Sequence, residues 1–424
     1  MRSLAARCAV SCALAASCAR PPAAPPGPQP PSGAPITFVE NDYPRALAEA
    51  RARGLPLFVD AWAPWCHTCL SMRQYVFPDA SLRRFADRFV WLSLDTEREE
   101  NAPVVTRLEV RALPTLFVID GATERVRLGW PGSMTAAELA ELLDAQLAAG
   151  GGGAEPGHAL AVDVLVTRAS AARHFAPCVS LAADEAPGMP PGTALVDVLR
   201  AALGCAEALP KDAPERGRLA GLTALAARVV SDRSLPVLAD DRSDLYDYVV
   251  NALRELGREG EARRVAATWA TFLENEAARA PFPAARAVFD SHRLLAYVAL
   301  GEPQRAIPML ARSERDFPDD YNPPARLGAA YFAMKRYDDA LAALGRALER
   351  AYGPRKLRLW SLEADVLLAR GDRAGAGRVL ADAVAFARRV PLTGHYPELR
   401  EALEKRLADL EPAGPTVDAS PPGN

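Results

Sequence analysis

The chain has 424 residues, of which 50% are hydrophobic and 24% are charged. This length exceeds that of one ordinary domain and predicts two or three, and the composition is typical of a folded globular protein. The net charge of −3 shows no excess of basic side chains. Composition therefore argues against nucleic acid or an anionic membrane surface as the main partner.

Residues 1–18 resemble an export signal. Arg2 and Arg7 precede a short apolar run, and Cys18 follows a series of small residues, which is the order of a secretory leader. The stretch "LAASC" resembles a bacterial lipobox, in which the cysteine becomes the lipidated first residue. We expect an exported, periplasmic protein that meets the membrane only through a lipid anchor on Cys18, with a plain cleaved signal peptide as the alternative.

Composition also divides the rest of the chain. Residues 19–35 are rich in proline and predict an extended spacer, whereas residues 150–157 are rich in glycine and predict a flexible linker. Two folded domains are expected between these boundaries, at 36–149 and 158–411. The Pro/Gly-rich residues 412–424 predict a disordered tail, and no segment after the leader has the roughly 18 apolar residues of a membrane-spanning helix.

Strands and helices alternate through the first domain. Asp42 is a suitable N-cap and Gly54 a suitable stop for the first helix, and Thr135 is a suitable cap for the last. The expected elements are a strand at 36–39, a helix at 42–54, a strand at 55–63, a helix that begins at the cysteines, a strand at 90–96, a helix at 102–110, a hairpin of strands at 113–120 and 125–130, and a helix at 135–149. This alternation predicts an α/β fold with helices on both faces of a central sheet.

The second domain has the pattern of an all-α protein. Residues 160–209 are ambiguous, because "ALAVDVLV" fits a strand while the segments after it fit helices. Farther on, small residues recur at Ala306, Ala340 and Ala376 within similar pairs of helices, and a weaker copy surrounds Ala262. This resembles the tetratricopeptide repeat and predicts a stacked solenoid; an ordinary helical bundle is the alternative.

One short stretch carries the chemistry: "WCHTC", with Cys66 and Cys69 after an apolar run. Two intervening residues place both sulfurs on one face of a helical turn, close enough to bond. Backbone N–H groups at a helix start favour an anion, so Cys66 is expected to form a thiolate. That thiolate would attack a partner disulfide, and Cys69 would then release the reduced partner.

The segments "FVDAWAPWCHTC" and "ALPTLFVID" resemble the thioredoxin family over about residues 36–149. The longer "WCHTCLSMRQYVFPDASLRRF" is similar to the C-terminal domain of the thiol:disulfide interchange protein DsbD. The resemblance implies a thioredoxin fold and a protein-disulfide reductase without a cofactor, although oxidases and isomerases share these residues. It further implies protein substrates with disulfides and a separate electron-donor protein.

The resemblance also implies roles for the neighbours of the cysteines. Pro114 matches the family's cis-proline, which would hold the backbone of Leu113 beside Cys66 to pair with a substrate peptide. Trp65 would shield one side of the pair and contact the substrate, or serve only in packing. Asp60 matches a buried acid that takes a proton during the exchange; the alternative is a structural carboxylate at the end of a strand.

His67 stands between the two cysteines. If its imidazole is protonated, it stabilises the thiolate of Cys66 and makes the pair more oxidising; if it is solvated, its effect is small. A metal site is not expected, because three ligands on one helical turn suit a closed tetrahedron poorly. The other histidines are scattered through the sequence at His158, His174, His292 and His395.

Two cysteines remain outside the leader and the "WCHTC" stretch. In an exported protein, Cys178 and Cys205 predict a structural disulfide; a second redox pair and two buried thiols are the alternatives. The whole sequence thus supports two hypotheses. In one, the protein is an enzyme whose helical domain binds a partner, and in the other it is an interaction scaffold to which the thioredoxin fold is accessory.

Overall fold

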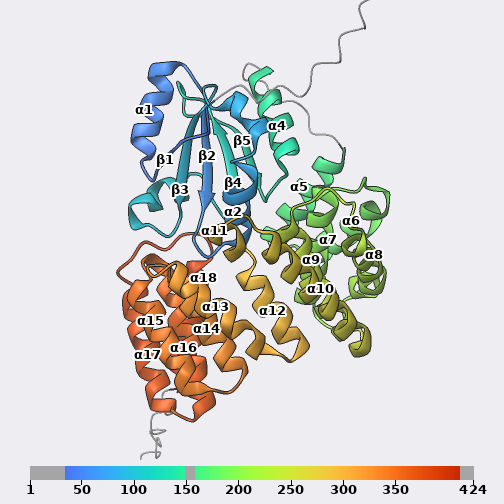
Figure 1. Cartoon of the computed structure of the whole chain (residues 1–424), viewed down its shortest axis with the longest axis vertical. Helices are drawn as coiled ribbons and strands as arrows, with labels where there is room; N and C mark the ends of the chain where they lie inside the picture. The colour runs from blue at the N-terminus through green and yellow to red at the C-terminus, as the bar shows by residue number, and fades with distance from the viewer. Residues whose placement is uncertain (1–33, 149–157, 411–424) are drawn as a thin grey trace, which may run out of the picture.

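The computed structural model describes residues 34–148 and 158–410. The predicted leader, nearly all of the proline-rich spacer, the glycine-rich linker and the C-terminal tail lie outside the described residues. Within the described ranges, no helix combines the length and the apolar composition needed to cross a membrane. Figure 1 shows an α/β domain seated on two groups of helices.

The α/β domain contains the strands and helices expected from the sequence. Asp42 caps the first helix by accepting from the Arg45 N–H at 3.0 Å, and Gly54 ends it with a positive φ of 63°, a conformation in which glycine meets no steric penalty. The elements are β1 (Phe38–Glu40), α1 (Tyr43–Arg53), β2 (Leu57–Trp62), α2 (His67–Ser71) continued by a π-helix (Met72–Val76), β3 (Val90–Asp95), α3 (Ala102–Arg107), β4 (Thr115–Ile119), β5 (Val126–Pro131) and α4 (Ala136–Ala148).

The five strands form one mixed sheet in the order β1-β3-β2-β4-β5. β1, β3 and β2 run parallel, while β4 is antiparallel to both β2 and β5. One apolar core, with α1 and α3, covers one face, and a second core, with the π-helix that continues α2 and with α4, covers the other. This arrangement confirms the predicted α/β fold with helices on both faces of the sheet.

The sheet places the cysteine segment at the end of its central strand. β2 lies between β3 and β4 and is buried along most of its length, which explains its apolar sequence. The chain leaves β2 at Trp62 and enters α2 at His67, five residues later, and Thr115 at the start of β4 pairs with Ala61. Consequently Pro114, immediately before β4, and Cys66, immediately before α2, lie at the same edge of the sheet.

The second domain is all α-helical in its described residues. The strand alternative for "ALAVDVLV" is wrong, because those residues lie within α5, where Val162 and Val166 are buried in the core shared with α6 and α7. The helices are α5 (His158–Ala171), α6 (Phe175–Glu185), α7 (Thr193–Ala208), α8 (Leu219–Ser231), α9 (Ala239–Glu255), α10 (Glu259–Arg279), α11 (Pro283–Ala287), α12 (Asp290–Leu300), α13 (Ala306–Asp316), α14 (Asn322–Ala333), α15 (Tyr337–Arg350), α16 (Lys356–Arg370), α17 (Arg373–Ala387) and α18 (Tyr396–Leu410).

The recurring small residues allow helices to pack closely in pairs. Ala306, Ala340 and Ala376 are fully buried in α13, α15 and α17. A side chain at Gly328 in α14 would place a Cβ 2.8 Å from Leu344 of α15, so this contact requires glycine. The alternation of small and large residues that predicted the repeat therefore reflects how neighbouring helices pack, with small residues where the helices lie closest.

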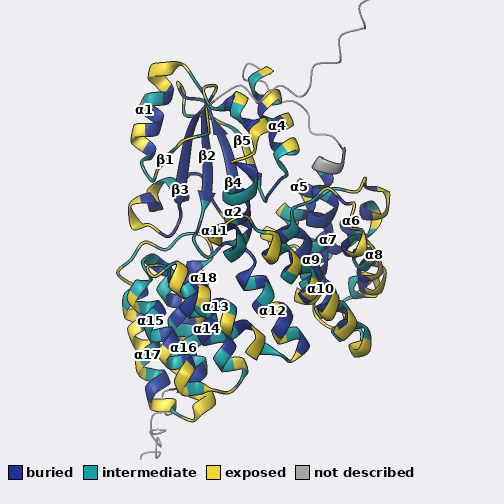
Figure 2. Cartoon of the chain, in the orientation of Figure 1, coloured by how far each residue is buried: buried dark blue, intermediate teal, exposed yellow. Residues whose placement is uncertain are grey.

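The helical domain packs against the edge of the sheet where β2 ends. Figure 2 shows buried ribbon continuing from the sheet into the helices through this junction. Tyr352 donates to Asp95 at 2.5 Å, and the neighbouring Gly353, with φ of 57°, approaches so closely that a Cβ there would collide with the Glu97 carbonyl. The two backbones thus meet directly at the end of β3.

Candidate active site and the helices that cover it

The two cysteines are bonded to each other at the start of α2. Cys66 occupies the N-cap position, and its Sγ accepts from the Cys69 N–H at 3.1 Å. The same N–H would face the sulfur after reduction, when a thiolate needs a donor. The geometry makes the two sulfurs unequal, because Cys66 precedes the helix while Cys69 lies inside its first turn and is fully buried.

Asp60 lies on β2, one strand-to-helix connection before the cysteines. Its carboxyl group is completely buried and neither oxygen has a hydrogen-bond partner among the described residues. The nearest cation is Arg73, whose Nη1 lies 3.8 Å from Oδ2. Burial raises the pKa of Asp60 to about 7, and Arg73 offsets only part of that effect. A carboxyl group with this pKa can accept and return a proton near neutral pH.

Arg73 is a site residue that the sequence analysis missed. It follows Cys69 by one helical turn, and its guanidinium lies 4.0 Å from the centre of the Trp62 ring while donating to Ser93 at 2.6 Å. The spacing of four residues on a helix was the available signal, since it places both side chains on one face. Arg73 supplies the positive charge next to Asp60.

The predicted peptide-pairing residues lie beside the disulfide. The Leu113–Pro114 peptide bond is cis, and Pro114 is buried. Leu113 and Trp65 pack in one apolar cluster with Cys66 and Cys69. The structure therefore brings Leu113 and Trp65 together with the two cysteines.

Trp65 also connects this cluster to the helical domain. Its indole N–H donates to Glu97 at 2.6 Å, and Tyr396 of α18 donates to both oxygens of the same carboxylate, at 2.7 and 2.9 Å. The guanidinium of Arg355 lies 5.0 Å from the ring centre. Burial raises the pKa of Glu97, while the bonds from Trp65 and Tyr396 oppose that rise. Trp65 is thus held between the two domains by directed bonds as well as by packing.

The helical domain covers the cysteines. Cys66 is only 4% exposed, and Asn322 of α14 donates to the Pro64 carbonyl at 3.1 Å, across 258 residues of sequence. A narrow groove remains beside the pair. It is lined by Trp65 and Leu113 on one side and by Gly394, His395 and Tyr396 on the other. Neither cysteine lines this groove, so Cys66 is covered in this arrangement of the domains.

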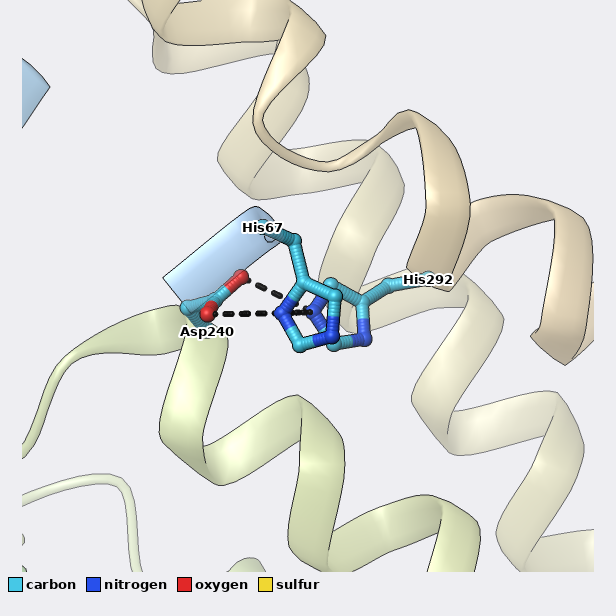
Figure 3. Close-up of side chains that lie close together, drawn as sticks. All are labelled: His67, Asp240 and His292. Atoms are coloured by element: carbon cyan, nitrogen blue, oxygen red, sulfur yellow. Dashed lines mark hydrogen bonds and ion pairs between the residues drawn. The ribbon is translucent and has the colours of Figure 1, made fainter. Parts of the chain in front are cut away.

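His67 takes part in a cluster with residues of two helices from the other domain. Its Nδ1 lies 3.0 Å from Oδ2 of Asp240 and 3.0 Å from Nε2 of His292 (Figure 3). Burial lowers the pKa of His67, but Asp244 and Asp240 outweigh burial and raise it to about 9. His292 is far from His67 in the sequence but meets it in the fold, so the expectation of scattered histidines is wrong for His292. The alternative in which the His67 side chain is simply solvated does not fit this contact.

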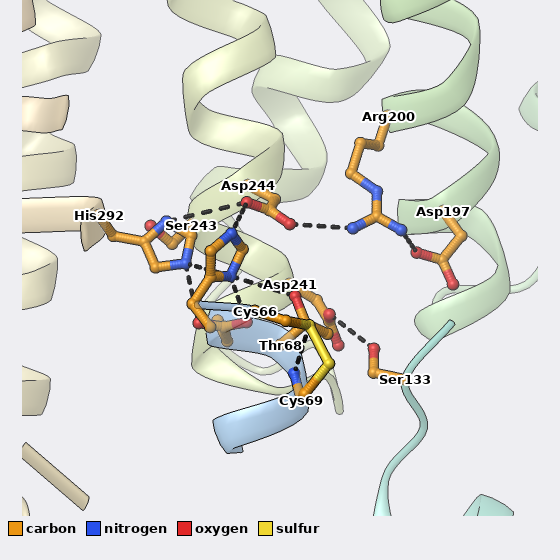
Figure 4. Close-up of polar contacts among 12 residues, drawn as sticks. Cys66, Thr68, Cys69, Ser133, Asp197, Arg200, Asp241, Ser243, Asp244 and His292 are labelled. Carbon is orange, nitrogen blue, oxygen red and sulfur yellow. Dashed lines mark hydrogen bonds and ion pairs between the residues drawn. A yellow bond between two sulfur atoms is a disulfide. The ribbon is translucent and has the colours of Figure 1, made fainter. Parts of the chain in front are cut away.

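A second polar network runs beside the first (Figure 4). Asp244 accepts from Arg200 at 2.9 Å, and Arg200 also donates to Asp197 at 2.8 Å. Ser133, which precedes α4, donates to the buried Asp241 at 2.7 Å. Burial raises the pKa of Asp241 well above its usual range, and the charge of Asp197 adds to the rise. Arg200 thus joins α7 to α9, and Ser133 joins α9 to the α/β domain.

The other cysteine pair lies apart from this site. Cys178 in α6 and Cys205 in α7 form a disulfide within the core of the helical domain, where they are 0% and 1% exposed. The sequence interpretation of a structural bridge matches this placement. Neither sulfur belongs to the apolar cluster around Cys66 and Cys69.

Comparison with known proteins identifies both parts of the chain. Residues 38–121 match the family model described as thioredoxin-like, and residues 297–365 match the model described as tetratricopeptide repeat. The chain is 29% identical to thioredoxin C-3 of Corynebacterium nephridii over 113 residues, 27% of this chain and 71% of that protein. The chain therefore carries a thioredoxin-like domain followed by tetratricopeptide repeats, as the sequence predicted.

Longer relatives match the same domain. The chain is 33% identical to the thiol:disulfide interchange protein DsbD of Cronobacter sakazakii over 91 residues, 21% of this chain and 16% of that protein. It is 29% identical to DsbD of Pseudoalteromonas atlantica over 82 residues, 19% of this chain and 14% of that protein. The match thus spans less than a fifth of either relative. Among solved structures, the TPR2AB-domain:pHSP90-complex of yeast Sti1 aligns with a TM-score of 0.26 at 15% identity, over 59% of this chain and 98% of that chain.

Replacing Asp60 by Asn is expected to stabilise the oxidised protein more and more as the pH rises. The folded pKa of about 7 exceeds the ordinary value of 3.8, so the folded state holds the proton more tightly than the unfolded state does. The contribution of Asp60 to stability is therefore present below about pH 4 and is lost as the pH rises through about 7. Urea unfolding at pH 4, 6 and 8 should show the gap between variant and wild type widening by up to about 4 kcal/mol.

Asp120→Asn is the matched control for this experiment. Asp120 is paired with Arg127, which holds the pKa of its carboxyl below the usual range, so it stays ionised throughout the window. Its replacement should lower stability by the same amount at pH 6 and 8. Parallel curves for Asp60→Asn and the wild type would contradict the assignment of a raised pKa to Asp60.

Replacing Tyr396 by Phe is expected to speed alkylation of Cys66 in the reduced protein. The variant loses the hydroxyl that donates one hydrogen bond, shared between the two oxygens of a buried carboxylate between the domains, a change of about 1.5 kcal/mol, which favours opening about tenfold. The rate is measured by mass spectrometry of the peptide that contains Cys66. Tyr337→Phe is the control, since Tyr337 packs on Phe332 within the helical domain. Equal rates in all three proteins would show that this contact does not limit access.

Proposed function

We propose that this protein is an extracytoplasmic thiol–disulfide oxidoreductase that reduces disulfides of other proteins, with its helical domain as the partner-binding part. The observation that carries the proposal is the constellation at the end of β2. A bonded Cys66–Cys69 pair at a helix start, a cis-proline at position 114 and the buried Asp60 occur together. Thiol exchange uses each of these groups, and a purely structural module needs none of them.

The chemistry begins from the dithiol form. The Cys66 thiolate attacks one sulfur of the substrate disulfide, a mixed disulfide forms, and the other substrate sulfur leaves as a thiolate. Asp60 accepts the proton of Cys69, directly or through water, and the Cys69 sulfur then attacks Cys66. The Cys66–Cys69 bond forms, the second substrate sulfur leaves, and two electrons have passed to the substrate. The structure corresponds to this oxidised product, and a dithiol protein must reduce it again.

The groove beside Leu113 supports an extended peptide as the substrate. Backbone next to the cis-proline can pair with such a peptide as an added strand, and the opposite wall comes from Gly394, His395 and Tyr396 of the helical domain. Both domains would therefore contact the same substrate. Tetratricopeptide repeats commonly present protein-binding surfaces, which supports the helical domain as the part that selects the partner.

Two further observations support the direction and the compartment. The relatives named thiol:disulfide interchange protein match the domain that holds Cys66 and Cys69, which favours interchange with a donor and an acceptor. The buried Cys178–Cys205 disulfide is of a kind that persists in oxidising compartments. Together with the leader at residues 1–18, this supports export to the periplasm, with Cys18 as the lipid anchor.

Replacing Cys66 by Ser is expected to abolish the reduction of insulin disulfides, because the attacking sulfur is lost. Cys69→Ser should instead accumulate a mixed disulfide between Cys66 and the substrate, because the resolving sulfur is lost. Turbidity of reduced insulin measures the first effect, and nonreducing electrophoresis measures the second. The Cys178→Ala/Cys205→Ala variant, which lacks only the bridge in the helical core, should keep activity while it remains folded.

An active Cys66→Ser protein would overturn the proposal. The scaffold alternative is favoured by one observation, the burial of Cys66 under the helical domain. The scaffold hypothesis predicts that a partner captured by the wild type is still captured after both active-site cysteines are replaced. It also predicts that neither Cys66→Ser nor Cys69→Ser affects thiol exchange in the partner. The two sets of outcomes separate the hypotheses.

The reduction potential of the Cys66–Cys69 pair tests the direction. Proteins that use this chemistry span about −270 mV for reductants to about −120 mV for oxidants. A reductase is expected near the negative end, measured by equilibrium with glutathione and quantified by mass spectrometry. A potential near −120 mV would contradict reduction and favour disulfide formation.

A further inference from the structure

Three segments that are distant in sequence meet around one point between the domains. His67 comes from the start of α2 in the α/β domain, Asp240 from the start of α9 and His292 from the start of α12 (Figure 3). Asp240 and His292 are fully buried, and the side chain of His67 is 27% exposed. The junction therefore holds two imidazoles and a carboxylate where apolar contacts would be expected, next to the covered disulfide.

The donor atoms of the three side chains lie close together, with each ring nitrogen facing a different oxygen of Asp240. Nδ1 of His67 lies 3.0 Å from Asp240 Oδ2 and 3.0 Å from His292 Nε2, and His292 Nε2 lies 2.8 Å from Asp240 Oδ1. Ligand atoms around an ion with bonds of about 2.0–2.1 Å lie roughly 3.0–3.4 Å apart. The two ring nitrogens and the carboxylate oxygens that face them thus lie about as close together as ligands around a single small cation.

Hydrogen bonds alone cannot satisfy all the ring nitrogens and carboxylate oxygens of this cluster. Each ring nitrogen carries at most one proton, and if both N–H groups point to Asp240 they face each other across 3.0 Å. If one of these two nitrogens is deprotonated instead, Asp240 loses one of its two hydrogen-bond donors. The Thr68 hydroxyl, 3.1 Å from His67 Nδ1, competes for the same lone pair. A cation in the middle takes a lone pair from each of the three groups and removes the conflict.

The outer nitrogens of both rings face one carboxylate. Asp244 Oδ1 lies 3.6 Å from His67 Nε2 and 3.8 Å from His292 Nδ1, and Arg200 fixes Asp244 from the far side at 2.9 Å (Figure 4). His292 Nδ1 is buried and has no hydrogen-bond partner among the described residues. A carboxylate behind a metal-binding imidazole is the usual outer partner, since it orients the inner lone pair toward the metal.

We propose that His67, Asp240 and His292 bind one divalent transition-metal ion of the zinc class at the junction of the two domains. Two imidazoles and one carboxylate suit Zn²⁺ and its neighbours, whereas Mg²⁺ and Ca²⁺ prefer sets made of oxygen. Three protein ligands leave a position open for water. Because one ligand comes from the α/β domain and two from the helical domain, the ion holds the helices over Cys66 and Cys69. This site stands apart from the thiol exchange proposed above.

The test is direct titration of the full chain with Zn²⁺ after removal of metal by a chelator, with both disulfides intact so that no thiolate competes. Calorimetry should show one ion per chain with a dissociation constant below about 1 μM, a binding free energy of about −8 kcal/mol. His292→Gln and Asp240→Asn should each weaken binding by more than the about 10–100-fold expected for an outer residue such as Asp244→Asn. His174→Gln, an exposed histidine outside the cluster, should bind as the wild type does.

Cobalt gives a second readout that does not depend on how well a variant folds. Wild-type protein loaded with Co²⁺ should show two paramagnetically shifted imidazole N–H resonances, one for each histidine. The same titration on the Cys66→Ser/Cys69→Ser protein should give the same affinity, which separates this site from the exchange activity. The proposal is overturned if the wild type binds no Zn²⁺ at about 100 μM, if His292→Gln binds it equally well, or if the two resonances are absent. The cluster is then a hydrogen-bonded contact between domains.

Discussion

The closure of the helical domain over the end of β2 is the constraint on which the rest of the structure depends. Asn322 donates to the Pro64 carbonyl, and Tyr396 and Trp65 both donate to Glu97, so the helical domain lies directly over the cysteines. Cys66, Cys69 and Asp60 therefore all lie in a place of low dielectric constant. The same closure turns His67 from a neighbour of Cys66 into part of a cluster between domains.

The local structure could be predicted from the sequence because each element carries its own signal. Asp42 and Gly54 mark the ends of α1, and the continuous apolar run from Leu57 marks β2 as a strand buried on both faces. The start of α5 could not be decided in this way. "ALAVDVLV" is rich in residues that favour strands, but packing against α6 and α7 determines its conformation, and tertiary contacts commonly override weak propensities of this kind.

In the candidate site too, residues with a local sequence signal could be predicted, whereas residues placed by contacts between the domains could not. Cys66, Cys69, Asp60 and Pro114 lie on segments whose spacing follows from one fold, so the family pattern locates them. Glu97 and Tyr396 are 299 residues apart and meet only because the domains pack. Periodicity shows which face of a helix is apolar but not which surface it will cover, and no pattern in the sequence links His292 to His67. The residues that cover the site were therefore beyond prediction, although the site itself was not.

Closure of the helical domain over Cys66 and the ionisation and oxidation state of that cysteine must influence each other. Burial disfavours a thiolate relative to a thiol or a disulfide, so a closed arrangement stabilises the bonded pair and an open one stabilises the reduced, ionised Cys66. Coupling of this kind is reciprocal: whatever favours opening also favours the thiolate, and reduction of the pair favours opening. Under the proposed function, a partner that bound the helical domain in an open arrangement would thereby activate the attacking cysteine, and closure would become favourable once Cys66 and Cys69 bond again.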